Sequence, residues 1–119
     1  MTTKVSRYEA NPEAGMQASR FTPTDAFTTD DKTETNHFYY AAADESILTG
    51  VWECAPCREE IAAHPVHEMM TILSGSVTVT EAGKEAETFV AGDTFFIEKG
   101  TECVWEITET VKKFYMIAG

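Results

Sequence analysis

Residues 68–108 read EMMTILSGSVTVTEAGKEAETFVAGDTFFIEKGTECVWEIT. The stretch consists of short runs of valine, isoleucine, threonine and aromatic residues, which favour β-strands. Turn residues separate the runs about 8–10 positions apart, a rhythm that is typical of all-β sandwiches and barrels. The turn signals are Ser74-Gly75, Ala82-Gly83, Ala91-Gly92-Asp93 and Lys99-Gly100. This stretch therefore predicts an all-β fold.

Further strands are predicted on both sides of this stretch. The full set covers residues 37–43, 46–54, 68–73, 76–80, 87–90, 94–97, 103–108 and 112–117. Successive side chains of a strand point to opposite faces of the sheet. In the run 102–108, Cys103 and Trp105 therefore share one face, while two glutamates lie on the other. We expect Cys103 and Trp105 to point into the barrel.

The first part of the chain has a different character. Residues 1–36 are polar, contain Pro12 and Pro23, and show no sustained strand or helix period. They predict an extended, irregular lead-in with a short strand or turn around residues 18–27. The rest of the chain, residues 37–119, predicts a single barrel domain.

Composition excludes several classes of function. The formal net charge is −11, and such a surface repels nucleic-acid phosphates and anionic lipids. No apolar run approaches the roughly 20 residues that span a bilayer, and no hydrophobic stretch follows the N-terminus as in a secretory signal. Three cysteines, an odd number, do not predict a disulfide framework. We expect a cytoplasmic protein that binds neither nucleic acid nor membranes.

Two parts of the sequence resemble the two characteristic motifs of cupins. Glu68, six further residues and Gly75 match the glutamate-to-glycine spacing of the first motif. Gly92-Asp93 and Gly100 match the start and the middle glycine of the second motif. Within the cupins, the chain resembles the domain-of-unknown-function 861 group, also called the ureidoglycine aminohydrolase-type cupins. The segments that carry this second resemblance are 50–53, 68–75, 91–93, 103–107 and 111–115.

The resemblance implies a particular barrel and assembly. The barrel would be a single cupin domain, the jelly roll or double-stranded β-helix, with a pocket inside it. Single-barrel cupins commonly form homodimers, so we expect a homodimer. The lead-in of residues 1–36 would pack on the partner subunit.

The resemblance also assigns candidate metal ligands. Metal-binding cupins use two histidines, a glutamate and a third histidine, and the matching residues here are Ala62, His64, Glu68 and Cys103. His64, Glu68 and Cys103 could hold a divalent ion of zinc, iron, manganese or nickel. The loss of one histidine, and Pro65 next to His64, favour a metal-free pocket, with the metal site as the alternative.

The pocket is predicted to bind an unknown small molecule. Its expected lining is Trp52, Met70, Cys103 and Trp105, with Glu68 as the candidate catalytic residue. Burial in an apolar barrel raises the pKa of a carboxyl group towards a range that suits proton transfer. Two functions stay open: an enzyme, which the resemblance implies is a metal-dependent hydrolase of a ureido or amino compound, and a binding module without catalysis.

One further motif, Cys54-Ala-Pro-Cys57, has the spacing of redox-active cysteine pairs. In such proteins the pair begins a helix inside a βαβ unit, whereas here only a single helical turn could follow before the next strands. We expect an inert pair in a loop. A disulfide, or a metal or redox role, is the alternative.

Overall fold

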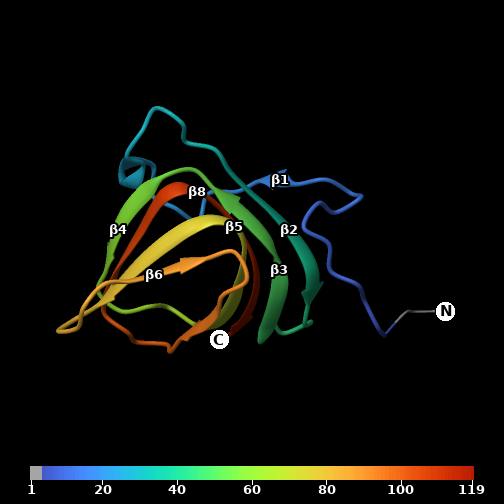
Figure 1. The fold of residues 1–119 in the computed structure, drawn as a ribbon. Helices are drawn as coiled ribbons and strands as arrows, with labels where there is room; N and C mark the ends of the chain where they lie inside the picture. Colours follow the sequence, from blue (N-terminus) through green and yellow to red (C-terminus); the bar gives the residue numbers. More distant parts are fainter. Residues whose placement is uncertain (1–3) are drawn as a thin grey trace.

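The computed structural model describes residues 4–119 as an antiparallel β-barrel, and the expected all-β fold is confirmed (Figure 1). Its strands are β1 (Gln17–Ala18), β2 (Glu34–Ala41), β3 (Ile47–Cys54), β4 (Cys57–Ile61), β5 (His67–Glu81), β6 (Glu87–Val90), β7 (Thr94–Ile97) and β8 (Cys103–Ala118). One 3-10 helix, η1 (Thr24–Ala26), precedes β2. Among the described residues, no helix is long and apolar enough to cross a membrane.

Two long strands, β5 and β8, organise the barrel. They pair with each other along most of their length. The other edge of β8 binds β4 along its first half and β3 along its second half. The other edge of β5 binds β7 and then β6. Because each long strand bridges two shorter ones, the sheet curls around a common interior (Figure 1).

Gly75 lies where β5 bends. The pairing of β5 with β8 shifts register between Ile72 and Val77, and Gly75 has a φ of +74°. A side chain there would place its Cβ 2.0 Å from the carbonyl oxygen of Thr110. The two strands predicted over 68–73 and 76–80 are therefore one continuous strand, and the glycine supplies a bulge rather than a turn.

A similar correction applies to β8, which joins the strands predicted over 103–108 and 112–117. Between them lie the exposed residues Thr108–Thr110, of which Glu109 pairs with Ser76 in the bulged part of β5. Their polarity resembles a turn in the sequence, although the backbone stays extended. The predicted alternation at the start of β8 is confirmed, because Cys103, Trp105 and Ile107 are all buried.

Strand β4 was not predicted, and the loop or helical turn expected after Cys54-Ala-Pro-Cys57 is wrong. Residues Cys57–Ile61 pair with Cys103–Ile107 of β8. Arg58 and Glu60 face outward and form an ion pair of 3.3 Å. The alternation was hidden in the sequence because the inward residue between them is itself charged, Glu59.

The lead-in packs on the barrel of its own chain. Strand β1 pairs with β2, which begins at Glu34 rather than at His37. Farther upstream, the ring of Tyr8 stacks on Tyr39 with 4.2 Å between centroids. The Nζ atom of Lys112 donates a 2.7 Å hydrogen bond to Oδ1 of Asn11. These contacts attach the lead-in to its own barrel, and its packing on a partner subunit stays a prediction.

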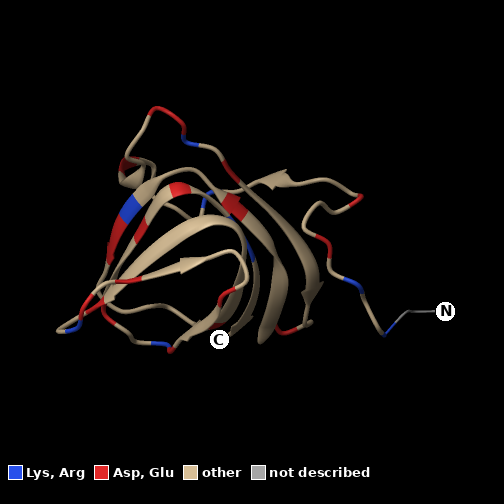
Figure 2. Cartoon of the chain, in the orientation of Figure 1, with Lys and Arg blue, Asp and Glu red and all other residues tan. Residues whose placement is uncertain are grey.

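Charged residues are spread over the loops and along several strands, and acidic residues outnumber basic ones (Figure 2). Three charged side chains are buried: Glu34, Glu68 and Lys113. A buried charge is costly unless it is paired or hydrogen-bonded. The interior around these three residues is therefore the candidate location of a functional site.

Candidate functional site

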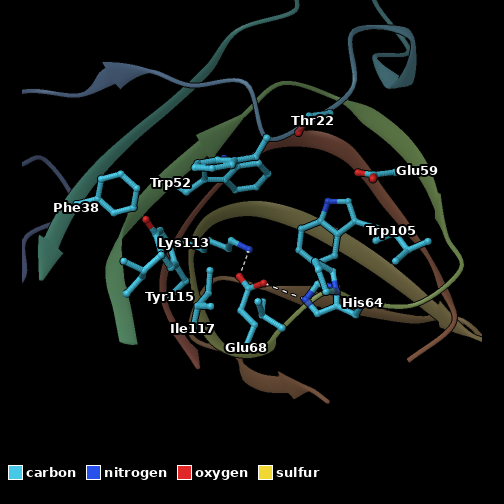
Figure 3. Close-up of a pocket in the computed structure, with 15 residues that line it drawn as sticks. Thr22, Phe38, Trp52, Glu59, His64, Glu68, Trp105, Lys113, Tyr115 and Ile117 are labelled. Carbon is cyan, nitrogen blue, oxygen red and sulfur yellow. Dashed lines mark hydrogen bonds and ion pairs between the residues drawn. The ribbon is translucent and has the colours of Figure 1, made fainter. Parts of the chain in front are cut away.

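A cavity of about 290 Å³ occupies part of the barrel interior (Figure 3). A water molecule takes up about 30 Å³ of liquid, so this space holds roughly ten waters or one small organic molecule. Most of its wall is aromatic or aliphatic, and five polar residues interrupt it. The lining consists of Phe21, Thr22, Phe38, Leu48, Trp52, Glu59, Ile61, His64, Pro65, Val66, Glu68, Trp105, Lys113, Tyr115 and Ile117.

An ion pair between Glu68 and Lys113 lies in this cavity. Glu68 is near the start of β5, Lys113 is on the second half of β8, and both side chains point inward (Figure 3). The Nζ atom of Lys113 donates a 2.8 Å hydrogen bond to Oε2 of Glu68. The two side chains are 10% and 7% exposed. The pair is thus shielded from water, where a charge-assisted hydrogen bond is strong.

Two tryptophan rings enclose the ammonium group of Lys113. Its Nζ atom lies 4.7 Å from the ring centroid of Trp52 and 4.7 Å from that of Trp105. The negative face of an indole attracts a cation, and the attraction grows when water is excluded. The sulfur of Met70 lies 3.3 Å from the same nitrogen. Lys113 is therefore fixed in position by Glu68 and by both rings.

His64 contacts the other oxygen of Glu68. Its Nε2 atom lies 3.1 Å from Oε1, and an ionised carboxylate only accepts hydrogen bonds, so Nε2 carries the proton. The backbone of His64 is held by Thr101 and Gly100, through hydrogen bonds of 2.8 Å each. The Nδ1 atom is buried and has no hydrogen-bond partner among residues 4–119.

These contacts set the charge state of Glu68. Burial alone raises the pKa of a carboxyl group. The charge of Lys113, together with the hydrogen bonds from His64 and Lys113, outweighs burial and lowers the pKa of Glu68 to about 2. The raised pKa expected for this residue is therefore wrong, because Lys113, which is distant in the sequence, lies beside it. At neutral pH, Glu68 is a carboxylate.

Glu34 connects the lead-in to the cavity. Its carboxylate accepts hydrogen bonds from the Ser19 hydroxyl at 2.6 Å and from the backbone N–H groups of Phe21 and Thr22 at 3.0 and 2.9 Å. It also accepts one from Nε1 of Trp52 at 2.9 Å. Burial acts to raise the pKa of Glu34, but these four hydrogen bonds prevail and lower it. One carboxylate thus orients Trp52 and places Phe21 and Thr22 at the cavity wall.

Glu59 adds a third carboxylate to the site. It lies on β4 directly across from Trp105 of β8, and Figure 3 shows it near the Trp105 ring at the cavity wall. Partial burial, partly countered by the nearby His64, raises the pKa of Glu59, and the charge of Glu34 raises it further. No residue from 4 to 119 forms a hydrogen bond or an ion pair with the Glu59 side chain.

The structure brings most of the predicted site residues together. Trp52, His64, Glu68 and Trp105 all line the cavity. The predicted pocket positions of Met70 and Cys103 are corrected, because neither residue is part of the lining.

The reason differs for these two residues. Met70 is fully buried in the core, and Lys113 lies against its sulfur. Cys103 is the first residue of β8, where Ile61 of β4 and Glu81 of β5 are its cross-strand neighbours. Ile61 is part of the cavity lining, whereas Cys103 is buried outside the cavity.

Lys113, Glu34 and Glu59 were not identified from the sequence. For Lys113 a signal was present: Val111, Tyr115 and Ile117 alternate on the same face of the strand, so residue 113 had to point inward as well. Glu34 lies within residues 1–36, which the sequence predicts to be irregular. Glu59 lay in a strand that was not predicted.

The residues present do not fit the predicted metal site. Among the described residues, no three His, Cys, Asp or Glu side chains are grouped so that they could hold a metal ion. Lys113 places a positive charge 2.8 Å from Glu68, and His64 is bonded to the same carboxylate. Burial, with the charges of Glu81 and Glu59, raises the pKa of Cys103, which disfavours the thiolate that a metal requires.

The Cys54–Cys57 pair joins the end of β3 to the start of β4, and both side chains are free thiols that are fully buried. A hydrogen bond between the two sulfurs, and then burial, raise the pKa of the Cys54 thiol. The hydroxyl of Thr22 lies 3.7 Å from the Cys54 sulfur. The pair thus belongs to the core, and its expected inertness stays a prediction.

Comparison with solved structures supports the fold. A protein of unknown function from Pseudomonas syringae, of the DUF861 family, superposes with a TM-score of 0.81 at 22% identity, over 93% of this chain and 46% of its own. The present chain thus spans about half the length of that protein. A putative ethanolamine utilization protein Q from Salmonella typhimurium gives a TM-score of 0.65 at 20% identity, over 90% and 82% of the two chains.

A DUF861 family protein from Thermotoga maritima is more similar in sequence, with 29% identity, but it covers 55% of this chain and 73% of its own, with a TM-score of 0.50. No curated protein matches the sequence. The family model described as the EutQ-like cupin domain matches residues 41–115, which is more than half of the chain. The resemblance to cupins of the DUF861 group is thereby confirmed, and the chain belongs to the EutQ-like cupin domain family.

Proposed function

We propose that this protein binds a small organic molecule in its barrel cavity without a metal ion, and that Lys113 is the cation that balances Glu68. One observation carries the proposal: the Lys113 ammonium is bonded to Glu68 at 2.8 Å and lies 4.7 Å from both tryptophan centroids. A concave, mostly apolar cavity with a few fixed polar groups is the usual form of a small-molecule site.

Metal analysis tests the first part of the proposal. Protein purified without chelators is expected to contain no stoichiometric zinc, iron, manganese or nickel, and titration calorimetry with each ion is expected to show no tight binding. Stoichiometric metal that is lost in Glu68→Gln would contradict the proposal, because it would place the ion where Lys113 now neutralises the carboxylate.

A cavity-filling variant tests the second part. Ile61 lines the cavity, while its neighbour Glu60 points outward. We expect Ile61→Phe to abolish the binding of fragment-sized molecules seen by ligand-observed NMR, and Glu60→Phe to leave that binding unchanged. Equal binding by the two variants would show that the molecules bind elsewhere.

A catalytic role for Glu68 stays a prediction from the sequence. With a pKa of about 2, Glu68 holds no proton to donate at neutral pH. Binding is therefore the function we propose, and hydrolysis of a ureido or amino compound is not part of the proposal.

We also propose, as the sequence predicted, that the protein is a homodimer and acts in the cytoplasm. An apolar row on the outer face supports the dimer: Phe96, Met69 and Met116 are cross-strand neighbours on β7, β5 and β8 and are 58%, 44% and 43% exposed. Sedimentation velocity is expected to give a dimer, and Met69→Lys to give a monomer. A wild-type monomer at micromolar concentration would contradict the dimer.

A further inference from the structure

Glu59 is a partly buried carboxylate that faces the cavity without a partner. Strand β4 alternates, so that Cys57, Glu59 and Ile61 face inward while Arg58 and Glu60 pair with each other outside. Within residues 4–119, nothing donates a hydrogen bond to Glu59 and no cation pairs with it. An unpaired charge that has lost part of its water is unfavourable until an opposite charge approaches it.

The charges around the cavity are unequal. Glu59 and Glu68 line it, and Glu34 lies close enough for its charge to act on Glu59. The only lysine or arginine among the lining residues is Lys113, and Glu68 already pairs with it. Two of these three carboxylates therefore stay without a compensating cation when His64 is neutral. The electrostatic potential in the cavity is therefore negative, and it attracts positively charged ligands.

The wall beside Glu59 also suits a cation. Trp105 is the cross-strand neighbour of Glu59, and its indole is one of several aromatic rings in the lining. Aromatic faces together with a carboxylate form a common environment for organic ammonium groups. A ligand carboxylate would meet the opposite situation, because it would face Glu59 and compete with Glu68 for Lys113.

His64 completes the polar side of the cavity. It is 9% exposed, it lines the cavity, and its Nδ1 atom has no hydrogen-bond partner among the described residues. With the proton on Nε2 and bonded to Glu68, Nδ1 of the neutral ring is an acceptor.

We infer that the ligand of this cavity is a small organic ammonium compound, that Glu59 is its counter-ion, and that Trp105 forms the wall against which it packs. This inference rests on the proposed small-molecule binding and names the class of ligand. It assigns Glu59 as the residue that determines specificity for charge, while Lys113 and Glu68 form the fixed polar side of the cavity.

The two tryptophans give a direct readout, because they are the only ones in the chain and both line the cavity. The probes are two matched sets of equal shape and different charge: benzylamine, benzyl alcohol and benzoate, and butylamine, butanol and butyrate. Titration of the wild-type protein at pH 7 and low salt is expected to rank the amine first, the alcohol second and the carboxylate last within each set. The amine is expected to bind roughly tenfold more tightly than the alcohol, as for a partly desolvated charge pair.

Glu59→Gln is the decisive variant, and Glu60→Gln is its matched control. Both remove one negative charge from β4, but Glu60 points outward and its side chain is 76% exposed. We expect Glu59→Gln to lose the preference for the amine while it still binds the alcohol, which also shows that the variant is folded. Glu60→Gln is expected to keep the wild-type ranking.

The outcomes separate the two proposals. Tighter binding of the carboxylates, or an unchanged ranking in Glu59→Gln, would overturn the ammonium assignment and leave small-molecule binding intact. If no probe of any charge changes tryptophan emission even at millimolar concentration, the proposed binding function fails together with the ligand class.

Discussion

The Nζ atom of Lys113 lies 2.8 Å from Oε2 of Glu68 in the interior of the barrel. The two residues come from the second half of β8 and the start of β5, and each is less than 10% exposed. Each charge is the main compensation for the burial of the other. Stability, charge state and ligand preference of the cavity therefore all depend on this pair.

Removal of Lys113 is expected to destabilise the fold. Lys113→Met keeps the length and the contacts with the tryptophan rings but leaves Glu68 buried without its cation. Breaking a buried pair from one side costs about 3–5 kcal/mol, and we expect a loss in the free energy of unfolding of that size in urea denaturation. Lys112→Met is the matched control, because Lys112 points outward and, within residues 4–119, its side chain bonds only Asn11. It is expected to cost under about 1 kcal/mol.

The double variant Glu68→Gln/Lys113→Met separates pairing from packing. If the pair is the cause, the double variant is expected to lose clearly less stability than the sum of the two single variants. Additive losses would mean that Lys113 stabilises the core by its aliphatic chain alone.

Acid is expected to destabilise the protein through Glu68. Its pKa is about 2 in the folded protein against an ordinary value of 4.5, so the unfolded chain takes up the proton first as the pH falls. The stabilisation is therefore complete above pH 4.5 and is lost as the pH falls from there towards 2. It amounts to on the order of 3 kcal/mol. Urea denaturation at several pH values is expected to show a flatter dependence in this window for Glu68→Gln than for Glu60→Gln, and parallel curves would refute the assignment.

Much of the fold was predictable because it depends on local signals. Alternation predicts that Trp105 and Cys103 are buried, as they are. The first and last residues of β6 and β7 also agree with the predicted runs 87–90 and 94–97. The two long strands were divided in the prediction, because Gly75 gives the same local signal for a bulge and for a turn. Only the pairing of β5 with β8 on both sides of Gly75, and the close approach of the Thr110 backbone to it, distinguish the two.

The candidate site was less predictable, because its charges depend on contacts between distant parts of the chain. Glu68 was identified through a motif, but its pKa is set by Lys113, which is far away in the sequence. Likewise, Glu34 orients Trp52 across two strands, and no local pattern contains that contact. A strand with an inward charged residue, such as Glu59, contradicts the hydrophobic alternation that is used to find strands.

Glu34 is expected to hold the lead-in against the barrel. Its carboxylate accepts hydrogen bonds from Ser19, from two backbone N–H groups and from Trp52. Glu34→Gln removes the charge and part of the acceptor capacity, and hydrogen bonds to charged groups contribute about 1.5–3 kcal/mol. Under native conditions, we expect trypsin to cleave Glu34→Gln after the exposed Arg20 at roughly ten times the rate for the wild type.

Glu53→Gln is the control for this experiment, because it removes a carboxylate from β3 beside Trp52 without touching these hydrogen bonds. Its cleavage rate is expected to match the wild type. Equal rates for Glu34→Gln and Glu53→Gln would mean that the lead-in is held by its other contacts, such as the stacking of Tyr8 on Tyr39.

Gly75 and Gly83 provide the last test, which concerns the bend in β5. Both have a positive φ, +74° and +77°, so alanine is strained at either position by about 1–2 kcal/mol. At Gly75 the new Cβ would also lie 2.0 Å from the backbone oxygen of Thr110, whereas at Gly83 nothing lies within 4 Å. A backbone atom that is held in the sheet cannot move aside as a flexible side chain can. Gly75→Ala is therefore expected to lose at least about 3 kcal/mol of unfolding free energy in urea, and Gly83→Ala about 1 kcal/mol. Equal losses would show that the backbone conformation alone requires glycine, and that β5 does not approach β8 as closely as the bulge demands.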